Sequence, residues 1–482
     1  MRDMLVIGGG INGAGIARDA AGRGLSVALV EKDDLAQHTS SASTKLVHGG
    51  LRYLEQYEFR LVRESLAERE VLLANAPHIV WPLRFVLPHH AGLRPRWMLR
   101  AGLFLYDHIG GRRTLAGSSA VSLDDGVLQD RFRHGFAYSD CWVEDARLVV
   151  LNAIDARERG AAVLTRTAVT GLERHADRWV ASLSDGGRIE ARAAVNAAGP
   201  WVDDIAALAT QGRAAQRVRL VKGSHIVVPR KHERDHAYIF QHTDGRVVFA
   251  LPYQHAFTLI GTTDIPFDGN RDRVEISREE LTYLCAAASE YFREPVCEAD
   301  VVSTYAGVRP LYDDHAASSS TVTRDYVFEI DANEGAPLLN IYGGKITTYR
   351  KLAEHALEQL APHLATGPAW TRHVPLPGGD MADGFERFVT ALWAARPWLP
   401  ASMARRLARA YGTRCTAIFG KATSLGDLGQ HFGGDLYEAE LYYLREAEFA
   451  RSAEDVLWRR SKLGLHLPAA TAGAIEAWFA AT

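Results

Sequence analysis

The chain has 482 residues, of which 47% are hydrophobic and 23% charged, an ordinary globular composition with room for roughly two or three domains. Its 55 lysines and arginines against 58 aspartates and glutamates give a formal net charge of −3, so no global positive field favours nucleic acid. The four widely spaced cysteines form no CxxC pair, which argues against a zinc or thioredoxin-like motif and favours reduced thiols in a cytoplasmic protein; no metal is expected.

The chain begins with an apolar strand that runs into Gly8-x-Gly10-x-x-Gly13 and an alanine-rich helix, and a second apolar strand then ends on Glu31. This order is the dinucleotide-binding βαβ fingerprint, because the glycines allow a tight turn, close approach of a pyrophosphate and close helix packing. The helix N-terminus offers N–H groups to the diphosphate, and Glu31 can accept hydrogen bonds from a ribose 2′-hydroxyl. The first strand begins too early to leave room for a cleavable leader.

Small hydroxyl residues and one lysine follow at 39–45, and the run 46–55 contains a His-Gly-Gly turn. Beside a nucleotide site such residues suit a loop laid along the diphosphate and the ring beyond it. A plain solvated Ser/Thr loop is the alternative. Residues 59–76 form a predicted amphipathic helix that ends before Pro77.

Between residues 81 and 113 the composition becomes basic and aromatic, and Pro95 opens a short predicted helix through His108. Such a segment suits the headgroup layer of an anionic membrane. A charged surface helix that packs its aromatic side chains inward is an equal alternative. No uninterrupted apolar run in the chain reaches the about 20 residues that a membrane span needs. The arginines of this segment are Arg84, Arg94, Arg96, Arg100, Arg112 and Arg113.

A second βαβ-like unit is predicted from a helix over 143–159 and a strand over 161–165. A hairpin at 185–187 then leads into an apolar strand that ends in the small residues Ala198 and Gly199. Such an ending brings backbone close to something flat or phosphorylated, or marks a close crossing of helix and strand.

Residues 218–260 contain short apolar strands joined by tight turns, so we expect an antiparallel sheet that forms a second domain inserted into the first. The chain returns with a strand over 337–342, and Gly343-Gly344-Lys345 opens a helix whose N–H groups suit a negative flavin carbonyl. Helical patterns fill 380–482 without a visible catalytic constellation, which predicts a structural cap or an interaction domain.

Taken together, these motifs resemble those of the FAD-dependent glycerol-3-phosphate dehydrogenases, in particular the bacterial aerobic, respiratory-chain type. The resemblance runs from the first strand into the C-terminal helices. The motifs that carry it are Gly8–Gly15, Ser40–Glu55, Lys222–His225, Gly307–Leu311, Gly343–Arg350 and Asp455–Gly464.

The resemblance implies oxidation of sn-glycerol 3-phosphate to dihydroxyacetone phosphate, with electrons passing from FAD to a quinone. It implies an α/β fold, with a Rossmann-like FAD-binding domain, an inserted antiparallel-sheet substrate domain and an all-α C-terminal domain. Members of the family in bacteria sit on the cytoplasmic face of the inner membrane without spanning it. The expected partners are therefore the substrate, a quinone and an anionic membrane surface, with no nucleic acid and with a homodimer left open.

The expected segments follow from the same reading. The FAD-binding domain takes 1–80, 141–212 and 301–372, the basic and aromatic segment 81–140, the substrate domain 213–300 and the helical cap 380–482.

A phosphate monoester carries roughly two negative charges and needs several cationic donors. The candidates that match family motifs for substrate binding are Arg52, Tyr53, Arg309, Arg324 and Lys345, although Arg324 could instead form a plain ion pair with Asp325.

Hydride transfer from C2 to flavin N5 also needs a base for the C2 hydroxyl proton. His48 and His225 are hypotheses for it, and Arg309 and Lys345 complete the predicted catalytic set. The predicted cofactor-binding residues are Gly8, Gly10, Asn12, Gly13, Glu31, Ser40, Ser41, Ser43, Lys45, His48, Gly49, Gly50, Ala198, Gly199, Gly343, Gly344, Lys345 and Thr347.

Three alternatives remain open from the sequence. A glycerol-3-phosphate oxidase on the same scaffold would pass electrons to O₂ and release H₂O₂. A flavin amine oxidase of the sarcosine or D-amino-acid type would need fewer basic residues around a carboxylate. A nucleotide-binding scaffold would have no turnover.

Overall fold

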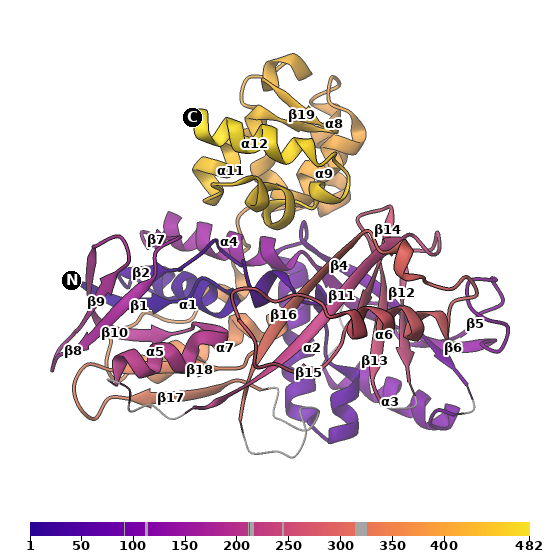
Figure 1. Cartoon of the computed structure of the whole chain (residues 1–482), viewed down its shortest axis with the longest axis horizontal. Helices are drawn as coiled ribbons and strands as arrows, with labels where there is room; N and C mark the ends of the chain where they lie inside the picture. The colour runs from indigo at the N-terminus through magenta and orange to yellow at the C-terminus, as the bar shows by residue number, and fades with distance from the viewer. Residues whose placement is uncertain (91, 111–113, 211, 213–215, 243–244, 314–324) are drawn as a thin grey trace.

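The computed structural model describes residues 1–482 except 91, 111–113, 211, 213–215, 243–244 and 314–324, and it leaves the side chains of residues 52, 55 and 56 undescribed. Two sheet-containing parts lie side by side, and a smaller helical domain stands on top of them (Figure 1).

The first sheet is mainly parallel and contains the predicted βαβ unit. Its main strands in spatial order are β17 (Val327–Asp331), β18 (Leu338–Tyr342), β10 (Arg188–Asn196), β1 (Arg2–Ile7), β2 (Val27–Val30) and β7 (Ala162–Leu164). Neighbours from β18 to β7 run parallel, whereas β17 is an antiparallel edge strand. The hairpin β8 (Val169–Arg174) and β9 (Trp179–Leu183) adds to β10.

Helices α1 (Ile11–Gly22), α4 (Asp145–Glu158) and α7 (Tyr349–Leu360) pack with this sheet, and α5 (Val202–Ala209) and the β8–β9 hairpin cover its other face. The carboxyl ends of β1, β2, β10 and β18 meet at one edge, because Ile7 pairs with both Val30 and Asn196, and Asn196 pairs with Asn340. The turns that follow these strands therefore lie together, where open α/β sheets bind their ligands.

The second sheet is mixed and larger than the predicted one. Its main strands in spatial order are β15 (Ile265–Pro266), β11 (Val218–Pro229), β14 (Phe257–Gly261), β13 (Val247–Tyr253), β12 (His236–Gln241), β4 (Val80–His89), β6 (His134–Val143) and β3 (Leu46–Val47). Strand β16 (Ser303–Tyr312) pairs with β11, and β5 (Ser119–Ser122) pairs with β6.

This sheet cuts across the expected segment boundaries. Strands β4, β5 and β6 come from the stretch expected to be a separate basic segment, 81–140, and β16 comes from the stretch expected in the FAD-binding domain, 301–372. The pairings responsible are β12 with β4 in parallel and β11 with β16 antiparallel, both between distant parts of the chain. Local patterns predict strands but not such long-range partners.

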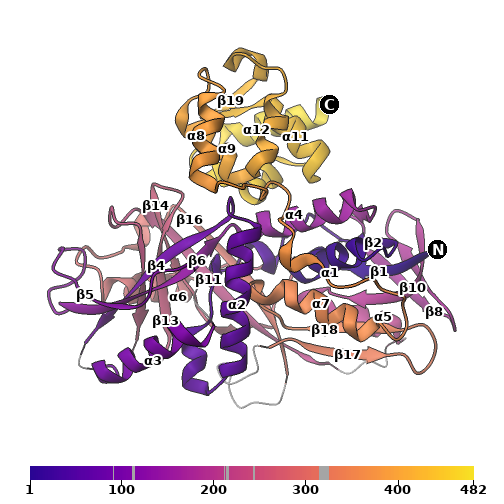
Figure 2. The same cartoon turned by 180° about the vertical axis from the view of Figure 1, so that it is seen from behind.

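Helix α6 (Arg278–Ser289) begins at the predicted capping box of Ser277 and Glu280 and covers one face of the second sheet. Helices α2 (Phe59–Asn75) and α3 (Arg96–Ile109) cover the other face, and α3 lies at the end of the molecule far from the C-terminal domain (Figure 2). On α3 only Leu103 and Tyr106 are buried, whereas Trp97 is 70% and Phe104 63% exposed. Among the described residues, no helix combines the length and apolarity required to cross a membrane.

The C-terminal domain has its own hydrophobic core. Its regular elements are α8 (Phe385–Ala394), α9 (Ala401–Tyr411), α10 (Cys415–Phe419), α11 (Glu438–Glu448), a π-helical segment (Asp455–Arg460), α12 (Ala470–Ala481) and the two short strands β19 (His431–Gly433) and β20 (Leu436–Tyr437). The two strands are a small departure from the expected all-α domain. The domain stands on α4 and the loops beside it (Figure 1).

Candidate active site

The turn between β1 and α1 leaves no room for side chains. Gly8 has φ of +108°, and a Cβ there would lie 2.5 Å from the carbonyl oxygen of Ala197. A Cβ on Gly13 would lie 1.8 Å from the carbonyl oxygen of Gly8, so helix and strand are in close contact. Gly10 precedes the first turn of α1, whose backbone N–H groups form a cradle suited to a diphosphate.

Glu31 lies directly after β2 and its carboxylate is buried. It accepts hydrogen bonds from the backbone N–H of Gly9 at 2.6 Å and of Asp33 at 2.9 Å. Burial raises the pKa of this carboxyl, and the two backbone donors act in the opposite direction. The carboxylate thus lies at the glycine turn, as a ribose-binding acid requires.

The loop 39–45 lies against both α1 and α4. The hydroxyl of Ser40 accepts a hydrogen bond from the backbone N–H of Ile11 at 3.0 Å. The ammonium of Lys45, however, is buried and donates to both carboxylate oxygens of Asp145 at 2.9 Å, and the hydroxyl of Ser43 donates to the same carboxylate at 2.7 Å. Lys45 also donates to the carbonyl oxygen of Ser41 at 3.0 Å. Ser43 and Lys45 therefore fasten the loop to α4.

Two glycine turns from distant parts of the chain meet beside the first one. The backbone N–H of His48 donates to the hydroxyl of Thr347 at 3.2 Å, and the side-chain amide of Asn12 donates to the carbonyl oxygen of Gly343 at 3.1 Å. Gly50, Gly343 and Gly344 all have positive φ. Most of the predicted cofactor-binding residues thus lie around one region, and Ala198 borders it, because its Cα lies 2.9 Å from the position of a Cβ on Gly8. Gly199, next in the chain, has φ of +56°.

A pocket of about 490 Å³ opens next to these turns. Its polar lining comes from His48, Tyr53, Thr262, Asp264 and Arg309, and from Arg94, Gln241 and Arg246. The rest of its wall is largely apolar and comes from α3, from the strands β4, β12 and β13, and from Leu51, Leu54 and Phe59. One pocket therefore combines a cationic, hydrogen-bonding end with an apolar one.

Arg309 is held at the polar end by its neighbours on the second sheet. Its guanidinium donates to the carbonyl oxygen of Thr263 at 2.9 Å and lies 3.2 Å from the carboxylate of Asp264. The space it occupies depends on Gly223 of the paired strand, since a Cβ there would lie 2.1 Å from the guanidinium. Such a fixed, planar donor suits a phosphate or carboxylate group.

The two candidate bases differ in position. His48 lines the pocket, whereas His225 is buried and is not one of its lining residues. The ring of His225 stacks on Tyr305 with centroids 4.7 Å apart, and its Nε2 lies 3.0 Å from the hydroxyl of Thr44. Burial, with the positive charges of Lys45 and Arg309, lowers the pKa of His225 well below its usual value, so this imidazole is neutral near pH 7.

The remaining predicted substrate residues are only partly described. The ammonium of Lys345 lies 3.8 Å from the centroid of the Tyr53 ring, which lines the pocket. The side chain of Arg52 and the whole of Arg324 lie outside the described residues, as do Arg112 and Arg113 of the basic segment.

A buried network that the sequence did not reveal supports the His48 turn. The backbone N–H of Gly49 donates to the hydroxyl of Tyr106 at 2.8 Å, and this hydroxyl donates to the carboxylate of Asp140 at 2.7 Å. Arg69 donates to the same carboxylate at 2.7 Å. Asp264 was not among the predicted site residues either. In the sequence it is marked only as an acidic residue shortly after a predicted strand.

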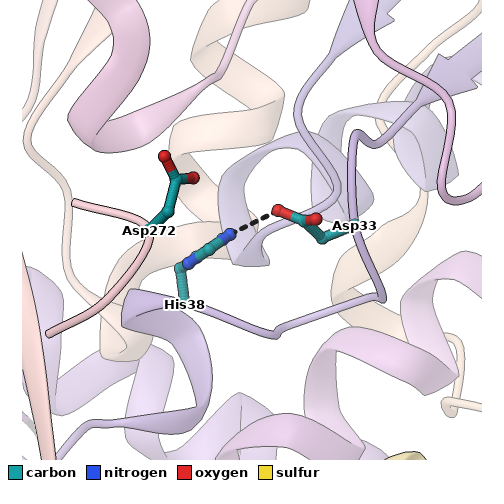
Figure 3. A group of neighbouring side chains, drawn as sticks. All are labelled: Asp33, His38 and Asp272. Carbon is teal, nitrogen blue, oxygen red and sulfur yellow. Dashed lines mark hydrogen bonds and ion pairs between the residues drawn. The ribbon is translucent and has the colours of Figure 1, made fainter. Parts of the chain in front are cut away.

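Among the described residues one group of side chains has the spacing of a metal site, namely Asp33, His38 and Asp272 (Figure 3). His38 Nε2 lies 2.7 Å from the carboxylate of Asp33. The ammonium of Lys32 lies 3.3 Å from that carboxylate and also pairs with Asp272. Because this cation already pairs with both carboxylates, we read the group as an ion-pair contact between the first and second sheet parts.

The comparisons with known proteins fit this geometry. Residues 3–350 match the family profile described as FAD dependent oxidoreductase, and residues 369–480 match that of the C-terminal domain of alpha-glycerophosphate oxidase. A glycerol-3-phosphate dehydrogenase of Pseudomonas aeruginosa is 55% identical over 472 residues, which cover 96% of this chain and 92% of the relative. The chain belongs to the family of FAD-dependent glycerol-3-phosphate dehydrogenases.

A second relative in this family carries a different name. A D-erythritol 1-phosphate dehydrogenase of Brucella abortus is 51% identical over 490 residues, which cover 99% of this chain and 97% of the relative. Among solved structures, a glycerol-3-phosphate dehydrogenase of Bacillus halodurans complexed with FAD is 30% identical, with a TM-score of 0.78, and the match covers 100% of this chain and 90% of that one.

The chain is therefore an FAD-dependent oxidoreductase, and the predicted family, fold class and cofactor are confirmed. The glycine cradle fits this cofactor, because the close contacts around Gly8 and Gly13 leave backbone, and no side chain, to approach a diphosphate.

Proposed function

We propose that the chain oxidises sn-glycerol 3-phosphate to dihydroxyacetone phosphate. The observation that carries this proposal is Arg309 at the polar end of a pocket that His48 also lines. A guanidinium fork pairs well with a phosphate monoester, whereas an unphosphorylated alcohol would leave it unused. The name of the Pseudomonas relative supports the same substrate.

The cofactor is assigned to the turns at the carboxyl edge of the first sheet. The N–H groups after Gly10 would hold the diphosphate and Glu31 the adenosine ribose, and the turns at 48–50 and 343–347 would flank the flavin ring. When bound, the flavin accepts a hydride at N5. The chain's own part is to fix the substrate's C2 beside that ring and to exclude water.

In this arrangement Arg309 binds the phosphate, together with the predicted Arg52, Arg324 and Lys345. Tyr53 lies beside Lys345 and lines the pocket, so we assign it to the same end. Several cations are expected because the phosphate is nearly doubly charged.

We propose that His48 rather than His225 accepts the proton from the C2 hydroxyl, because His48 lines the pocket, whereas His225 is buried and does not. Replacing His48 by Gln is expected to lower the rate of anaerobic flavin reduction by roughly 10²- to 10⁴-fold, the usual contribution of a general base. The matched variant His225→Gln should lose less than about tenfold, since this side chain is not among the residues that line the pocket. A larger loss in His225→Gln than in His48→Gln would reverse the assignment.

The second candidate substrate is D-erythritol 1-phosphate, which the Brucella relative's name favours. The pocket of about 490 Å³ exceeds the needs of a three-carbon phosphate, so a further hydroxymethylene group can be accommodated. The ratio of kcat/KM values for the two phosphates decides between them. We expect it to favour glycerol 3-phosphate, and a ratio in favour of the tetritol phosphate would replace our substrate assignment.

We further propose a quinone as electron acceptor. The apolar wall of the pocket, formed by Leu51, Leu54, Phe59 and residues of α3, suits a hydrophobic ring close to the flavin. The oxidase alternative would give H₂O₂ in equal amount to dihydroxyacetone phosphate under air. We expect instead that one short-chain quinone is reduced for each dihydroxyacetone phosphate formed, and that little H₂O₂ appears.

We propose that α3 holds the protein on the cytoplasmic face of the inner membrane. Its apolar face is exposed through Trp97 and Phe104, and Arg96 and Arg100 on the same helix suit anionic headgroups. A homodimer remains a prediction.

Replacing Trp97 and Phe104 together by Ser should weaken binding to anionic vesicles at least tenfold, because burial of each ring contributes about 1.5–3 kcal/mol. Co-sedimentation measures this effect. Trp393→Ser is the matched control, since Trp393 is 49% exposed but belongs to the C-terminal domain at the opposite end (Figure 2). Unchanged binding of the double variant would exclude α3 as the anchor.

A further inference from the structure

The C-terminal motif Asp455–Gly464 has no role in the site described so far, yet it reaches across to the FAD-binding part. Arg460 forms a bidentate pair with Asp34, with N···O distances of 2.5 and 2.7 Å, and Arg459 donates to the same carboxylate at 2.6 Å. The side chains of Asp34 and Arg460 are completely buried and that of Arg459 nearly so. Two guanidinium groups of one domain therefore converge on one carboxylate of the other.

Asp34 lies in the short loop that follows Glu31, and this loop is fastened to the glycine turn. The carboxylate of Glu31 accepts from the N–H of Gly9 at 2.6 Å. The side chains of Glu31 and Leu35 lie 2.7 and 3.0 Å from the position of a Cβ on Gly9, and the N–H of Ala36 donates to the carbonyl oxygen of Gly9 at 3.4 Å. A displacement of Asp34 would therefore move both the glycine turn and Glu31.

The same motif holds this loop from its other side through Arg166. The guanidinium of Arg166 donates to Asp455 at 2.6 Å, while its backbone N–H donates to the carbonyl oxygen of Asp33 at 2.8 Å. Arg459 completes the link with a 2.5 Å contact to Asp455. The loop 31–36 is thus held by ion pairs whose arginines and aspartates come from both domains, and of these side chains only that of Arg166 is not buried.

A buried ion pair adds little net stability, because the cost of removing two charges from water offsets their attraction. Removing one partner is nevertheless costly, because it leaves an uncompensated buried charge that the surrounding structure must rearrange to solvate. We infer that the C-terminal domain is a clamp for the cofactor, in which Arg459 and Arg460 are positioning residues that hold the loop 31–36 in its FAD-binding conformation. The inference rests on the proposed role of Glu31 toward the adenosine ribose and makes no use of the identity of the substrate.

The test measures FAD affinity directly, by titrating FAD into flavin-free protein of the full chain and following flavin fluorescence. Arg460→Met should weaken FAD binding at least tenfold. Arg460→Lys, which keeps a charge but loses the bidentate geometry, should weaken it by a smaller but measurable factor of at least about threefold. Because no substrate is present, failure of the substrate assignment cannot produce or mask this result.

Arg409→Met is the matched control. Arg409 reaches from the same domain across the same boundary, but it donates to the carbonyl oxygens of Pro77 and His78, far in the chain from the cofactor loops. We expect its FAD affinity to stay within about twofold of the parent protein. Equal weakening in Arg409→Met and Arg460→Met would overturn the clamp, because it would point to domain docking in general.

A second measurement keeps the inference testable if Arg460→Met does not fold. Hydrogen exchange of the flavin-free Arg460→Lys protein should be faster in residues 31–37 than in the parent, with exchange in the core of the C-terminal domain unchanged. Unchanged exchange in that loop together with unchanged FAD affinity would contradict the inference.

Discussion

Replacing Arg309 by Met should lower kcat/KM for sn-glycerol 3-phosphate by about a thousandfold. A charge-assisted hydrogen bond contributes roughly 1.5–3 kcal/mol, and the guanidinium can offer two to a phosphate. In the parent protein the carboxylate of Asp264 lies 3.2 Å from the guanidinium of Arg309. Without that positive charge, the carboxylate would repel the negatively charged phosphate of the substrate. Steady-state kinetics with a soluble quinone measure the loss.

Two comparisons make this prediction specific to the phosphate. The preference for glycerol 3-phosphate over glycerol should shrink by the same factor, because the lost contact concerns only the phosphate. Arg219→Met is the matched control, since Arg219 pairs with Asp313 on the same sheet and does not line the pocket. If Arg309→Met kept a thousandfold preference for glycerol 3-phosphate over glycerol, the phosphate would have to bind to residues other than Arg309.

Gly13→Ala should yield a protein that is purified largely without flavin and unfolds at a lower temperature. A Cβ at this position would lie 1.8 Å from the carbonyl oxygen of Gly8, and this backbone oxygen can move only if α1 moves away from β1. Overpacking usually lowers the free energy of unfolding by about 1–3 kcal/mol. We expect a loss near the upper end of this range, because the added Cβ meets backbone that cannot easily move. The flavin absorbance per protein and the unfolding midpoint measure both effects.

The matched control for this change is Gly473→Ala in α12, where a Cβ would meet nothing within 4 Å. This variant should keep its flavin and gain up to about 1 kcal/mol from helix propensity. A Gly13→Ala protein with full flavin content and the parent's midpoint would show that the close contact of α1 and β1 is not required.

Much of the fold could be predicted because its signals are local. The glycine spacing, the apolar run of β1 and the capping box at Ser277 each lie within a few residues, and each has its expected structural outcome. The assignment of β4 and β6 to the second sheet could not be predicted, because strand partners are chosen by the packing of the whole sheet.

The same limit applies to the site. Lys45 was expected to be a cationic residue of a nucleotide loop, but its ammonium pairs with Asp145, which lies 100 residues further along the chain. The pair of Arg460 with Asp34 joins residues 426 apart. His48 and Arg309 were found from motifs, whereas their meeting in one pocket required the tertiary structure.

The most direct test of the proposed function is an anaerobic absorbance spectrum of the purified protein before and after addition of substrate. We expect sn-glycerol 3-phosphate to bleach the oxidised flavin band rapidly, and glycerol and sarcosine, as controls without the phosphate, to leave it unchanged. A flavin band that sn-glycerol 3-phosphate does not bleach would contradict the assignment, even though the FAD-binding fold would stand.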